Sequence, residues 1–456
     1  MSEPRRILIV DDDAAVTNYL RIFLMQTELF EPVVENDSRN VPRLLEKNDI
    51  ALVLLDMDLP GLSGLDILRL IRDSGRSIPV IILTGVSDVD LAVKAMKLGA
   101  FDYLTKPADD DKLLETIDRA LEHEALSRSL HELPDKLSRD GLAHAAAFEG
   151  FVTADPGMIR LFHLAELMAA GDYSLFIMGE RGTGKESLAK AIHRSSPRHD
   201  GPFVAVDAAA IDKERQSAEL FGQVRGFQGL QEDRPGFLEK AAGGTLFLNS
   251  IECLSLPVQV RLKRVIQNEE YYRESSAEVR RIDVRLIVSS ILDLASDEYR
   301  DTFSRDLLYH LMVNSLHIPP LREHPGDIPL LAGHFLRLEA ERTGRMVEGF
   351  TDEFMALLVS YSYPGNVGEL EAIVSASVVN TEGRLVGLDS LPPFIRDQMG
   401  APSGPPGAAF KPRRLSDVIR DHVRGTLDYF GNDRIRAARE LGVAPEDLDR
   451  LASPPE

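Results

Sequence analysis

The chain has 456 residues, of which 44% are hydrophobic and 27% are charged, and its formal net charge is −21. This length predicts roughly three domains, and the negative charge argues against a protein that coats nucleic acid over its whole surface. The single cysteine excludes an internal disulfide, and no apolar run approaches the roughly 18 residues of a membrane span. We therefore expect a soluble, cytoplasmic protein without a membrane segment.

Residues 1–125 alternate short apolar runs with segments of helical periodicity. The apolar runs are ILIV (7–10), ALVLL (51–55), VIIL (80–83) and FDYL (101–104). Strands that alternate with helices predict a parallel α/β sheet. The polar, alanine-rich residues 126–148 that follow predict a linker helix.

Polar side chains follow each of these apolar runs. Asp11 and Asp12 follow the first run, Asp56 the second, Thr84 the third and Lys106 the fourth. The carboxyl ends of parallel strands meet at one edge of the sheet, where ligands bind. Carboxylates that converge there would repel one another without a cation, so the pattern predicts a Mg²⁺ site. The metal and Lys106 would offset the charge of an incoming phosphoryl group, and Thr84 would donate a hydrogen bond to it.

The same positions resemble the receiver domains of response regulators. The matching stretches are VDDD (10–13), LLDMDLPGLSG (54–64), LTG (83–85) and YLTKP (103–107). The resemblance implies a flavodoxin-like domain over residues 1–125, a sensor histidine kinase as partner, and Asp56 as the phosphoacceptor, assisted by Thr84 and Lys106. The Mg²⁺ ligands that it implies are Asp11, Asp12, Asp56 and the carbonyl group of Asp58. The alternative is that each acid is only a solvated loop residue. The match of residue type at several strand ends argues against this alternative.

A second α/β unit is predicted from about residue 149. Its strand-like runs are SLFIM (174–178), FVAV (203–206), TLFL (245–248) and VRLIV (284–288). GERGTGKE (179–186) follows the first run and opens a helix, which is the context of a phosphate-binding loop. Backbone N–H groups of such a loop point at phosphates, and its lysine reaches the β- and γ-phosphates. The candidate nucleotide-binding residues are Gly179, Gly182, Thr183, Gly184, Lys185 and Glu186.

This second unit resembles the AAA+ domain of sigma-54-dependent activators of the nitrogen-regulator type. Further matching stretches are AELFG (218–222), GGTLFL (243–248), IPPLREHPGDIPLL (318–331) and YPGNVGELE (363–371). The resemblance covers residues 149–395 and implies a P-loop α/β domain with a helical lid, ATP as its ligand, and assembly into dimers or rings. A Glu after the loop lysine is usual in this family, so Glu186 is no departure.

The residues that this family uses to hydrolyse ATP are replaced in this chain. An Asp–Glu pair ends the TLFL strand in the family, where this chain has Asn249 and Ser250. Asn carries no charge, and Ser is a poor general base for the attacking water. Glu252 is a candidate to replace the missing acid. The alternative interpretation is that it is only an acid at the start of a helix. The family's polar sensor position is Ile291.

The arginines that the family brings to the γ-phosphate are replaced as well. Ser304 and His310 stand at the positions of the two arginine fingers, and Arg305 is displaced by one residue as a partial substitute. Gly368 stands at the second-sensor arginine. Removing one such arginine lowers the rate on the order of 10³–10⁵-fold. The sequence therefore predicts a domain that binds ATP without efficient hydrolysis. The alternative is that the phosphate-binding loop is an evolutionary relic and binds no nucleotide.

The segment that contacts the sigma factor is altered too. The family carries GAFTGA, whereas this chain reads RGFQGLQ (225–231), one residue shorter and without the Thr. Phe227 stands in for the aromatic residue. This change argues against the normal contact with sigma-54 RNA polymerase.

The last part of the chain resembles a Fis-type helix-turn-helix, a small all-α domain expected over 413–456 after a flexible linker at 396–412. The second helix of such a motif reads the major groove of DNA. Here it is APEDLDRL (444–451), which sets three acids, Glu446, Asp447 and Asp449, against Arg450. Acids that face phosphate weaken binding. DNA binding and a dimerisation helix pair both stay open.

The sequence as a whole predicts a two-component response regulator that controls transcription and is phosphorylated on Asp56. Its AAA+ domain is expected to bind ATP without efficient hydrolysis and to lack the normal sigma-54 contact loop. One alternative is an active, ATP-hydrolysing sigma-54-dependent activator. Another is a regulatory subunit that acts by protein contact, for example in mixed rings with a complete relative.

Overall fold

The computed structural model divides into two compact units, Met1–Ile395 and Arg396–Glu456. The residues that it describes are 4–27, 29–47, 49–85, 89–132, 138–225, 232–392 and 395–396, and the single positions 423, 426, 434, 436, 438 and 448. The predicted flexible linker after residue 396 and most of the predicted helix-turn-helix therefore lie outside the described residues. No helix among the residues described is long and apolar enough to cross a membrane.

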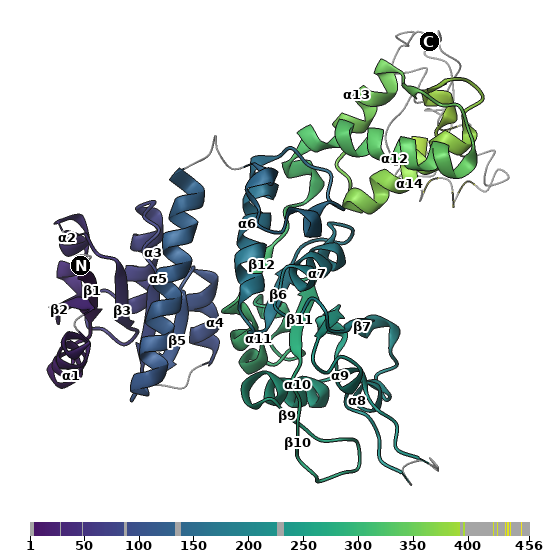
Figure 1. The fold of residues 1–456 in the computed structure, drawn as a ribbon. Coiled ribbons are helices and arrows are strands. Elements are labelled where there is room, and N and C mark those ends of the chain that lie inside the picture. The colour runs from purple at the N-terminus through teal and green to yellow at the C-terminus, as the bar shows by residue number, and fades with distance from the viewer. Residues whose placement is uncertain are drawn as a thin grey trace. The chain divides into compact units, whose positions relative to one another are not determined.

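The N-terminal domain is a parallel sheet of five strands with helices between them (Figure 1). The strands are β1 (Arg5–Val10), β2 (Phe30–Glu35), β3 (Leu52–Asp56), β4 (Val80–Thr84) and β5 (Asp102–Thr105). The helices are α1 (Ala14–Gln26), α2 (Val41–Lys47), α3 (Gly64–Asp73), α4 (Val89–Lys97) and α5 (Asp110–Glu132). The strand order β2-β1-β3-β4-β5 confirms the predicted flavodoxin-like fold.

Both faces of this sheet are covered, and this explains why its central strands read as unbroken apolar runs. Along β1, Leu8 and Val10 belong to a buried cluster that includes residues of α2, α3 and α4. Ile7 and Ile9 point to the other face, into a cluster with residues of α1 and α5. All of these side chains are buried, so alternate positions of one strand fill two separate cores.

Strand β2 was not predicted from the sequence. Its residues, FEPVVE, contain a proline and two glutamates, so they form no apolar run. Pro32 has no N–H to donate, which confines proline to edge strands and strand ends. The observed order places β2 at the edge, paired with β1 alone.

The segment predicted as a linker helix, residues 126–148, divides into two parts. Helix α5 continues through Glu132, while Arg139–Gly141 and Ala145–Phe148 form single 3₁₀ turns. Phe148 is fully buried and its ring centroid lies 5.2 Å from that of Phe162 in the next domain. An aromatic anchor thus fixes the second part to the AAA+ domain, so the segment is not one continuous helix.

The second domain has another five-stranded parallel sheet, with the order β12-β6-β11-β8-β7. Its strands are β6 (Leu175–Met178), β7 (Phe203–Asp207), β8 (Thr245–Asn249), β11 (Arg285–Ser290) and β12 (Ser315–His317), and a hairpin is formed by β9 (Glu270–Tyr271) and β10 (Arg280–Arg281). The helices are α6 (Pro156–Ala170), α7 (Lys185–Arg194), α8 (Gln216–Phe221), α9 (Phe237–Lys240), α10 (Leu256–Asn268) and α11 (Arg305–Met312).

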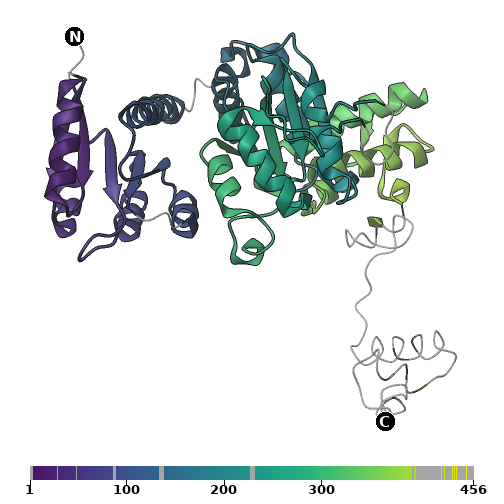
Figure 2. The same ribbon diagram turned by 90° about the horizontal axis from the view of Figure 1, so that it is seen from below.

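A mainly helical lid follows, as the resemblance implied; it is drawn in light green in Figure 2. It consists of α12 (Ile328–Thr343), α13 (Asp352–Ser360) and α14 (Asn366–Asn380), with the short strands β13 (Gly349–Phe350) and β14 (Leu385–Val386). Other single 3₁₀ turns lie at Ser38–Asn40, Ala208–Ala210, Ile251–Cys253, Asp297–Tyr299, Leu321–Glu323, Pro325–Asp327 and Leu388–Ser390.

Candidate functional site

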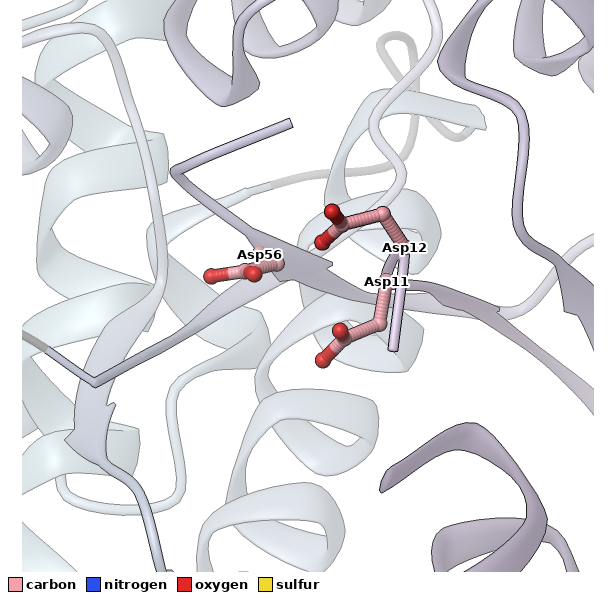
Figure 3. Close-up of side chains that lie close together, drawn as sticks. All are labelled: Asp11, Asp12 and Asp56. Carbon is pink, nitrogen blue, oxygen red and sulfur yellow. The ribbon is translucent and has the colours of Figure 1, made fainter. Parts of the chain in front are cut away.

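Three acidic side chains converge at the carboxyl edge of the first sheet (Figure 3). Asp11 and Asp12 follow β1, and Asp56 is the last residue of β3. One carboxylate oxygen of each residue lies within 4.8 Å of the other two. Asp58, whose carbonyl group completes the predicted set, lies two residues past Asp56 and has an exposed side chain. The donor set of carboxylates suits a hard divalent cation such as Mg²⁺.

Backbone geometry holds Asp56 in place. The N–H of Met57 donates to Asp56 Oδ1 over 2.7 Å. Gly64, which opens α3, lies so close that a Cβ there would be 2.4 Å from the Asp56 carbonyl oxygen. Asp13 takes no part in the cluster, because its carboxylate caps α1 by accepting the N–H of Ala15 over 2.8 Å.

Lys106 links two of the three carboxylates. Its Nζ lies 2.5 Å from Asp11 Oδ2 and 2.9 Å from Asp56 Oδ2. Burial lowers the pKa of Lys106, but hydrogen bonds and charge from both carboxylates outweigh it, so the pKa is raised. Burial likewise raises the pKa of Asp11, although Lys106 opposes this. One lysine against three carboxylates leaves a net negative site.

Thr84 ends β4, the strand next to β3, and it is fully buried. The strand register pairs Asp56 with Leu83, so Thr84 lies one residue farther along that same edge. Its carbonyl oxygen accepts the N–H of Lys106 over 2.7 Å. The structure therefore brings the predicted phosphoryl-transfer residues to one sheet edge.

The six predicted nucleotide-binding residues lie in the loop between β6 and α7 and in the first turn of α7. Gly182 has φ +77°, and a Cβ there would lie 2.1 Å from the carbonyl oxygen of Gly365 in the lid. Thr183 donates its hydroxyl hydrogen to the Glu180 carbonyl group over 3.0 Å. Glu186 is exposed and pairs with Lys190 over 2.7 Å.

Lys185 is buried, with 7% of its surface exposed. Its ammonium donates to the carbonyl oxygens of Gly179 and Glu180, both over 2.8 Å. Burial lowers the pKa of Lys185, and the negative charge of Glu252 opposes the shift. The ammonium group of Lys185 is thus held by the loop. A bound triphosphate would compete with the two carbonyl oxygens for its N–H donors.

Two cavities flank the loop and share Gly182 and Gly184 in their walls. One, of about 290 Å³, is walled by apolar side chains together with lid residues, among them Phe151, Val152, Met158, Leu331 and Phe335. The other, of about 490 Å³, lies at the ends of β7 and β8. An apolar pocket beside a polar one matches the two ends of a nucleotide.

Sequence reasoning did not identify the wall of the apolar cavity. Phe151 packs on Phe162, with ring centroids 4.9 Å apart. Buried Asp327 ties the same segment to the lid, because its carboxylate accepts the Ala154 N–H over 2.8 Å and the Thr153 hydroxyl. These residues lie far apart in the sequence, and no local pattern marks them.

The polar cavity is where the predicted hydrolytic replacements lie. Asn249, Ser250 and Ile291 all line it, together with Lys185 and Asp207. The side-chain oxygen of Asn249 accepts the Ser289 hydroxyl over 2.6 Å. Ser250 adopts the left-handed conformation with φ 57° and ψ 49°. The end of β8 therefore presents an amide and a hydroxyl to the cavity, and no carboxylate.

Helix α11 and its N-cap contain the two positions at which the resemblance implies arginine fingers and this chain has Ser304 and His310. Ser304 is its N-cap, whose hydroxyl oxygen accepts the Leu307 N–H over 3.3 Å. Arg305 donates to the carbonyl oxygens of Leu294 and Ser296 over 3.0 and 2.9 Å. Its guanidinium thus supports its own chain, which argues against the role of substitute finger. Burial lowers the pKa of His310, the residue at the other finger position.

The lid braces the phosphate loop from the other side. Glu180 forms two hydrogen bonds with Arg322, of 2.6 and 2.8 Å, which lower the pKa of Glu180 to about 2. The Val367 N–H donates to the Gly182 carbonyl oxygen over 3.1 Å. Gly368 lines the apolar cavity, and a Cβ there would meet only Gly182 Cα, at 3.9 Å. Space therefore exists for a side chain at Gly368.

Two predicted features fall outside the described residues. One is the altered sigma-factor contact segment, because residues 226–231 include Phe227 and all of RGFQGLQ except Arg225. The N–H of Arg225, which is described, donates to Asp233 over 2.8 Å. The acidic helix at 444–451 also lies outside, apart from Leu448. Of the basic residues before it, Arg434 and Arg436 are helical and exposed.

Comparison with known protein families accounts for most of the chain. Residues 7–118 match the response regulator receiver domain, residues 151–317 the sigma-54 interaction domain, and residues 322–405 the AAA+ ATPase lid domain.

Relatives with the same extent are found among characterised proteins and solved structures. The transcriptional regulatory protein ZraR of Escherichia coli K12 is 36% identical over 443 residues, with 97% of each chain covered. The regulatory protein AtoC of the same strain is 33% identical over 454 residues, with 98% of this chain and 97% of AtoC covered. The crystal structure of NtrX from Brucella abortus in complex with ATP has a TM-score of 0.52 and 29% identity, with 98% of each chain covered. The chain therefore belongs to the family of two-component response regulators that join a receiver domain to a sigma-54 interaction domain of the AAA+ class and its lid.

Proposed function

We propose that this protein is a cytoplasmic transcriptional response regulator, phosphorylated on Asp56, whose AAA+ domain binds ATP without efficient hydrolysis. The observation that carries the proposal is the contrast within the polar cavity. Lys185 and its loop are complete, whereas Asn249 and Ser250 stand where β8 would need an acid and a base. ATP then acts as a structural ligand of the domain.

Receiver chemistry in this proposal is a phosphoryl transfer from a sensor histidine kinase. An Asp56 carboxylate oxygen forms the new P–O bond as the P–N bond to the donor histidine breaks. Lys106, 2.9 Å from that carboxylate, offsets charge on the phosphoryl oxygens, and Thr84 donates a hydrogen bond to one of them. Mg²⁺, held by Asp11, Asp12, Asp56 and the Asp58 carbonyl group, would supply further charge neutralisation.

Nucleotide binding follows from the two cavities around the loop. The apolar cavity takes the base, while Lys185 and the loop N–H groups take the phosphates. The B. abortus relative was crystallised with ATP and with ADP, which supports a nucleotide site in this chain as well. At a hundredfold excess over Kd, a bound ligand stabilises the folded state by about 2.7 kcal/mol.

Output in this proposal is self-assembly into dimers or rings and transcription control, without the normal sigma-54 contact loop. The missing Thr in RGFQGLQ supports the last point. Fis-type helices at 413–456 would add either a weak DNA contact or a dimerisation surface, and the acids at 446, 447 and 449 favour the second.

A steady-state ATPase assay tests the proposal. The full chain, phosphorylated on Asp56 and concentrated enough to assemble, is assayed beside a nucleotide-binding titration of the same sample. We expect saturable ATP binding and phosphate release no faster than that of Lys185→Ala, a matched control that loses the phosphate contact. Turnover well above this control would show instead an active, sigma-54-type ATPase.

A further inference from the structure

A buried histidine lies in the wall of the apolar cavity beside the phosphate-binding loop. His324 lines this cavity of about 290 Å³, and only 7% of the residue is exposed. It lies between the 3₁₀ turns Leu321–Glu323 and Pro325–Asp327, just before the first lid helix. Burying a polar ring costs free energy unless its nitrogens form hydrogen bonds. Each ring nitrogen of His324 therefore needs a partner.

One ring nitrogen of His324 has its partner in Asp327. Nδ1 lies 2.9 Å from Asp327 Oδ2. The same carboxylate, which is 1% exposed, also accepts the Ala154 N–H over 2.8 Å and the Thr153 hydroxyl. Because a carboxylate only accepts hydrogen bonds, Nδ1 carries the ring hydrogen. In the neutral ring, Nε2 is then an acceptor.

The other ring nitrogen has no partner in the chain. Nε2 of His324 forms no hydrogen bond with any residue that the structure describes, yet it is not sealed from solvent. It therefore opens into the cavity that His324 lines. The ring cannot turn away without losing the bond to the buried Asp327 carboxylate. The wall of the cavity thus presents one acceptor in a fixed position.

The other polar side chains that line this cavity are not fixed in the same way. Thr183 donates its hydroxyl hydrogen within the phosphate loop. Ser187 and Glu371 are exposed. His334 is half-buried and forms no hydrogen bond with the described residues, so its ring is not held by an acid. A ligand in the cavity meets its buried, oriented acceptor at His324.

We propose that His324 recognises the base of the bound nucleotide, with Nε2 accepting a hydrogen bond from the amino group of adenine. This inference rests on the nucleotide binding proposed above, in which the apolar cavity takes the base. Adenine carries an amino donor on the carbon where guanine carries a carbonyl acceptor. A fixed acceptor opposite that carbon therefore selects ATP over GTP. Asp327 is the positioning residue, since it keeps the hydrogen on Nδ1.

The apolar wall by itself does not make this selection. Phe151, Val152 and Leu331 offer dispersion contacts, which depend little on which polar group a purine carries. A site with a buried hydrogen-bonding group, in contrast, rejects an analogue that leaves this group unpaired. The selection between bases therefore depends on the polar atom of His324.

The test compares ATP with two analogues, by calorimetry on the full chain in Mg²⁺ buffer. Purine riboside triphosphate lacks the amino group, and GTP carries an oxygen on the same carbon. The wild-type chain should bind ATP roughly tenfold or more tightly than either analogue, because a buried acceptor otherwise stays unpaired. His324→Phe keeps an aromatic ring without the acceptor. Its affinities for ATP and for purine riboside triphosphate should be about equal.

Two further variants complete the design. His334→Phe makes the same substitution in the same cavity wall, and it should keep the wild-type ratio of ATP affinity to purine riboside triphosphate affinity. Asp327→Asn can donate an amide hydrogen to Nδ1 of His324, which moves the ring hydrogen to Nε2 and turns the acceptor into a donor. This variant should lose the preference for ATP although the histidine is still present.

The outcomes separate this inference from the proposed function. A wild-type chain that binds none of the three nucleotides would overturn both. A wild-type chain that binds ATP and purine riboside triphosphate equally well would overturn the inference alone, and this result needs no variant. A full preference for ATP in His324→Phe, or an equal loss of that preference in His334→Phe, would also overturn it. Parallel losses of affinity for all three nucleotides in His324→Phe, with the ratios unchanged, would show that the histidine only supports the fold.

Discussion

At the scale of single residues, the two sites of this protein differ in which side chains are present. Around Asp56, each position that phosphoryl transfer uses carries a suitable side chain, and Lys106 lies within hydrogen-bond distance of two carboxylates. Around Lys185, the predicted phosphate-binding residues are present. The acidic pair that the resemblance implies at the end of β8 is replaced by Asn249 and Ser250. Under the proposed function, ATP binding and ATP turnover are therefore separable in this chain.

Gly182 and Gly368 offer a matched test of the phosphate loop. At Gly182, Ala would need φ +77°, and its Cβ would lie 2.1 Å from the Gly365 carbonyl oxygen. A left-handed alanine alone costs roughly 1–2 kcal/mol, so Gly182→Ala should lower the melting temperature by several degrees and abolish ATP binding. Gly368→Ala meets ordinary contacts in helix α14 and should leave both unchanged or slightly raise stability. Thermal unfolding with and without ATP measures this, and equal effects of the two substitutions would contradict the geometry.

The contact between Glu180 and Arg322 predicts a pH dependence. The pKa of Glu180 is lowered to about 2 from an ordinary value of 4.5, so the folded state favours the charged form. The resulting stability is fully present above about pH 5 and is lost as the pH falls toward 2. Because 39% of the Glu180 side chain is exposed and solvent screens the ion pair, the effect should stay below about 1 kcal/mol. The difference in unfolding midpoint between wild-type chain and Glu180→Gln should therefore shrink between pH 5 and pH 3; a constant difference would argue against the ion pair.

At the scale of secondary-structure elements, the polar groups at the start of helix α11 form hydrogen bonds within the chain. Ser304 caps the helix, and Arg305 binds two backbone carbonyl groups of the preceding loop. Neither residue needs a neighbouring subunit for this. The helix has the sequence position of the family's arginine fingers, but its polar groups are used within the chain.

Arg305→Ala should consequently act on stability. Removing the guanidinium leaves the carbonyl groups of Leu294 and Ser296 without their donor, which costs roughly 1–3 kcal/mol where they are buried. We expect a lower unfolding temperature with unchanged ATP affinity and unchanged phosphate release. Arg281→Ala, at an exposed arginine of β10, is the control and should match the wild-type chain. A fall in phosphate release without a fall in stability would instead identify Arg305 as a finger.

Most elements of the two sheets were predictable because their central strands are buried on both faces. Such strands read as apolar runs, and the polar residue after each run marks the site. The two missed strands lack this signal, since β2 contains Pro32 and two glutamates and β12 has only three residues, SLH.

Features that depend on contacts distant in sequence were not predictable from local pattern. The apolar cavity joins Phe151 to Leu331 and Phe335 of the lid, and no spacing rule links them. The buried oxygen of Glu252 and the carbonyl contacts of Arg305 depend on side-chain packing. Glu252 and Arg305 were both candidates from the sequence, and packing distinguishes them. Glu252 Oε2 is buried without a hydrogen-bond partner, whereas two guanidinium nitrogens of Arg305 donate to backbone carbonyl groups.

At the scale of the whole molecule, the proposed function joins a phosphorylated receiver to an AAA+ domain that binds ATP without efficient hydrolysis, and it predicts a switch whose output is assembly or contact. Family membership rests on matches to the receiver, sigma-54 interaction and lid domains, and the relatives cover 97% of the chain. Three of the replacements that the resemblance implies, Asn249, Ser250 and Ile291, line one cavity. ATP that stays bound would stabilise the domain in either phosphorylation state.

The fate of one bound ATP tests this account most directly. Excess phosphorylated full-length protein is mixed with Mg²⁺ and ATP labelled at the γ-phosphate, quenched at intervals, and analysed for intact ATP and free phosphate, with Lys185→Ala as the non-binding control. We predict that nearly all bound ATP is recovered intact after many minutes, with phosphate release at the rate of the control. Cleavage of the bound ATP within seconds would contradict the central claim and identify the protein as a working ATPase.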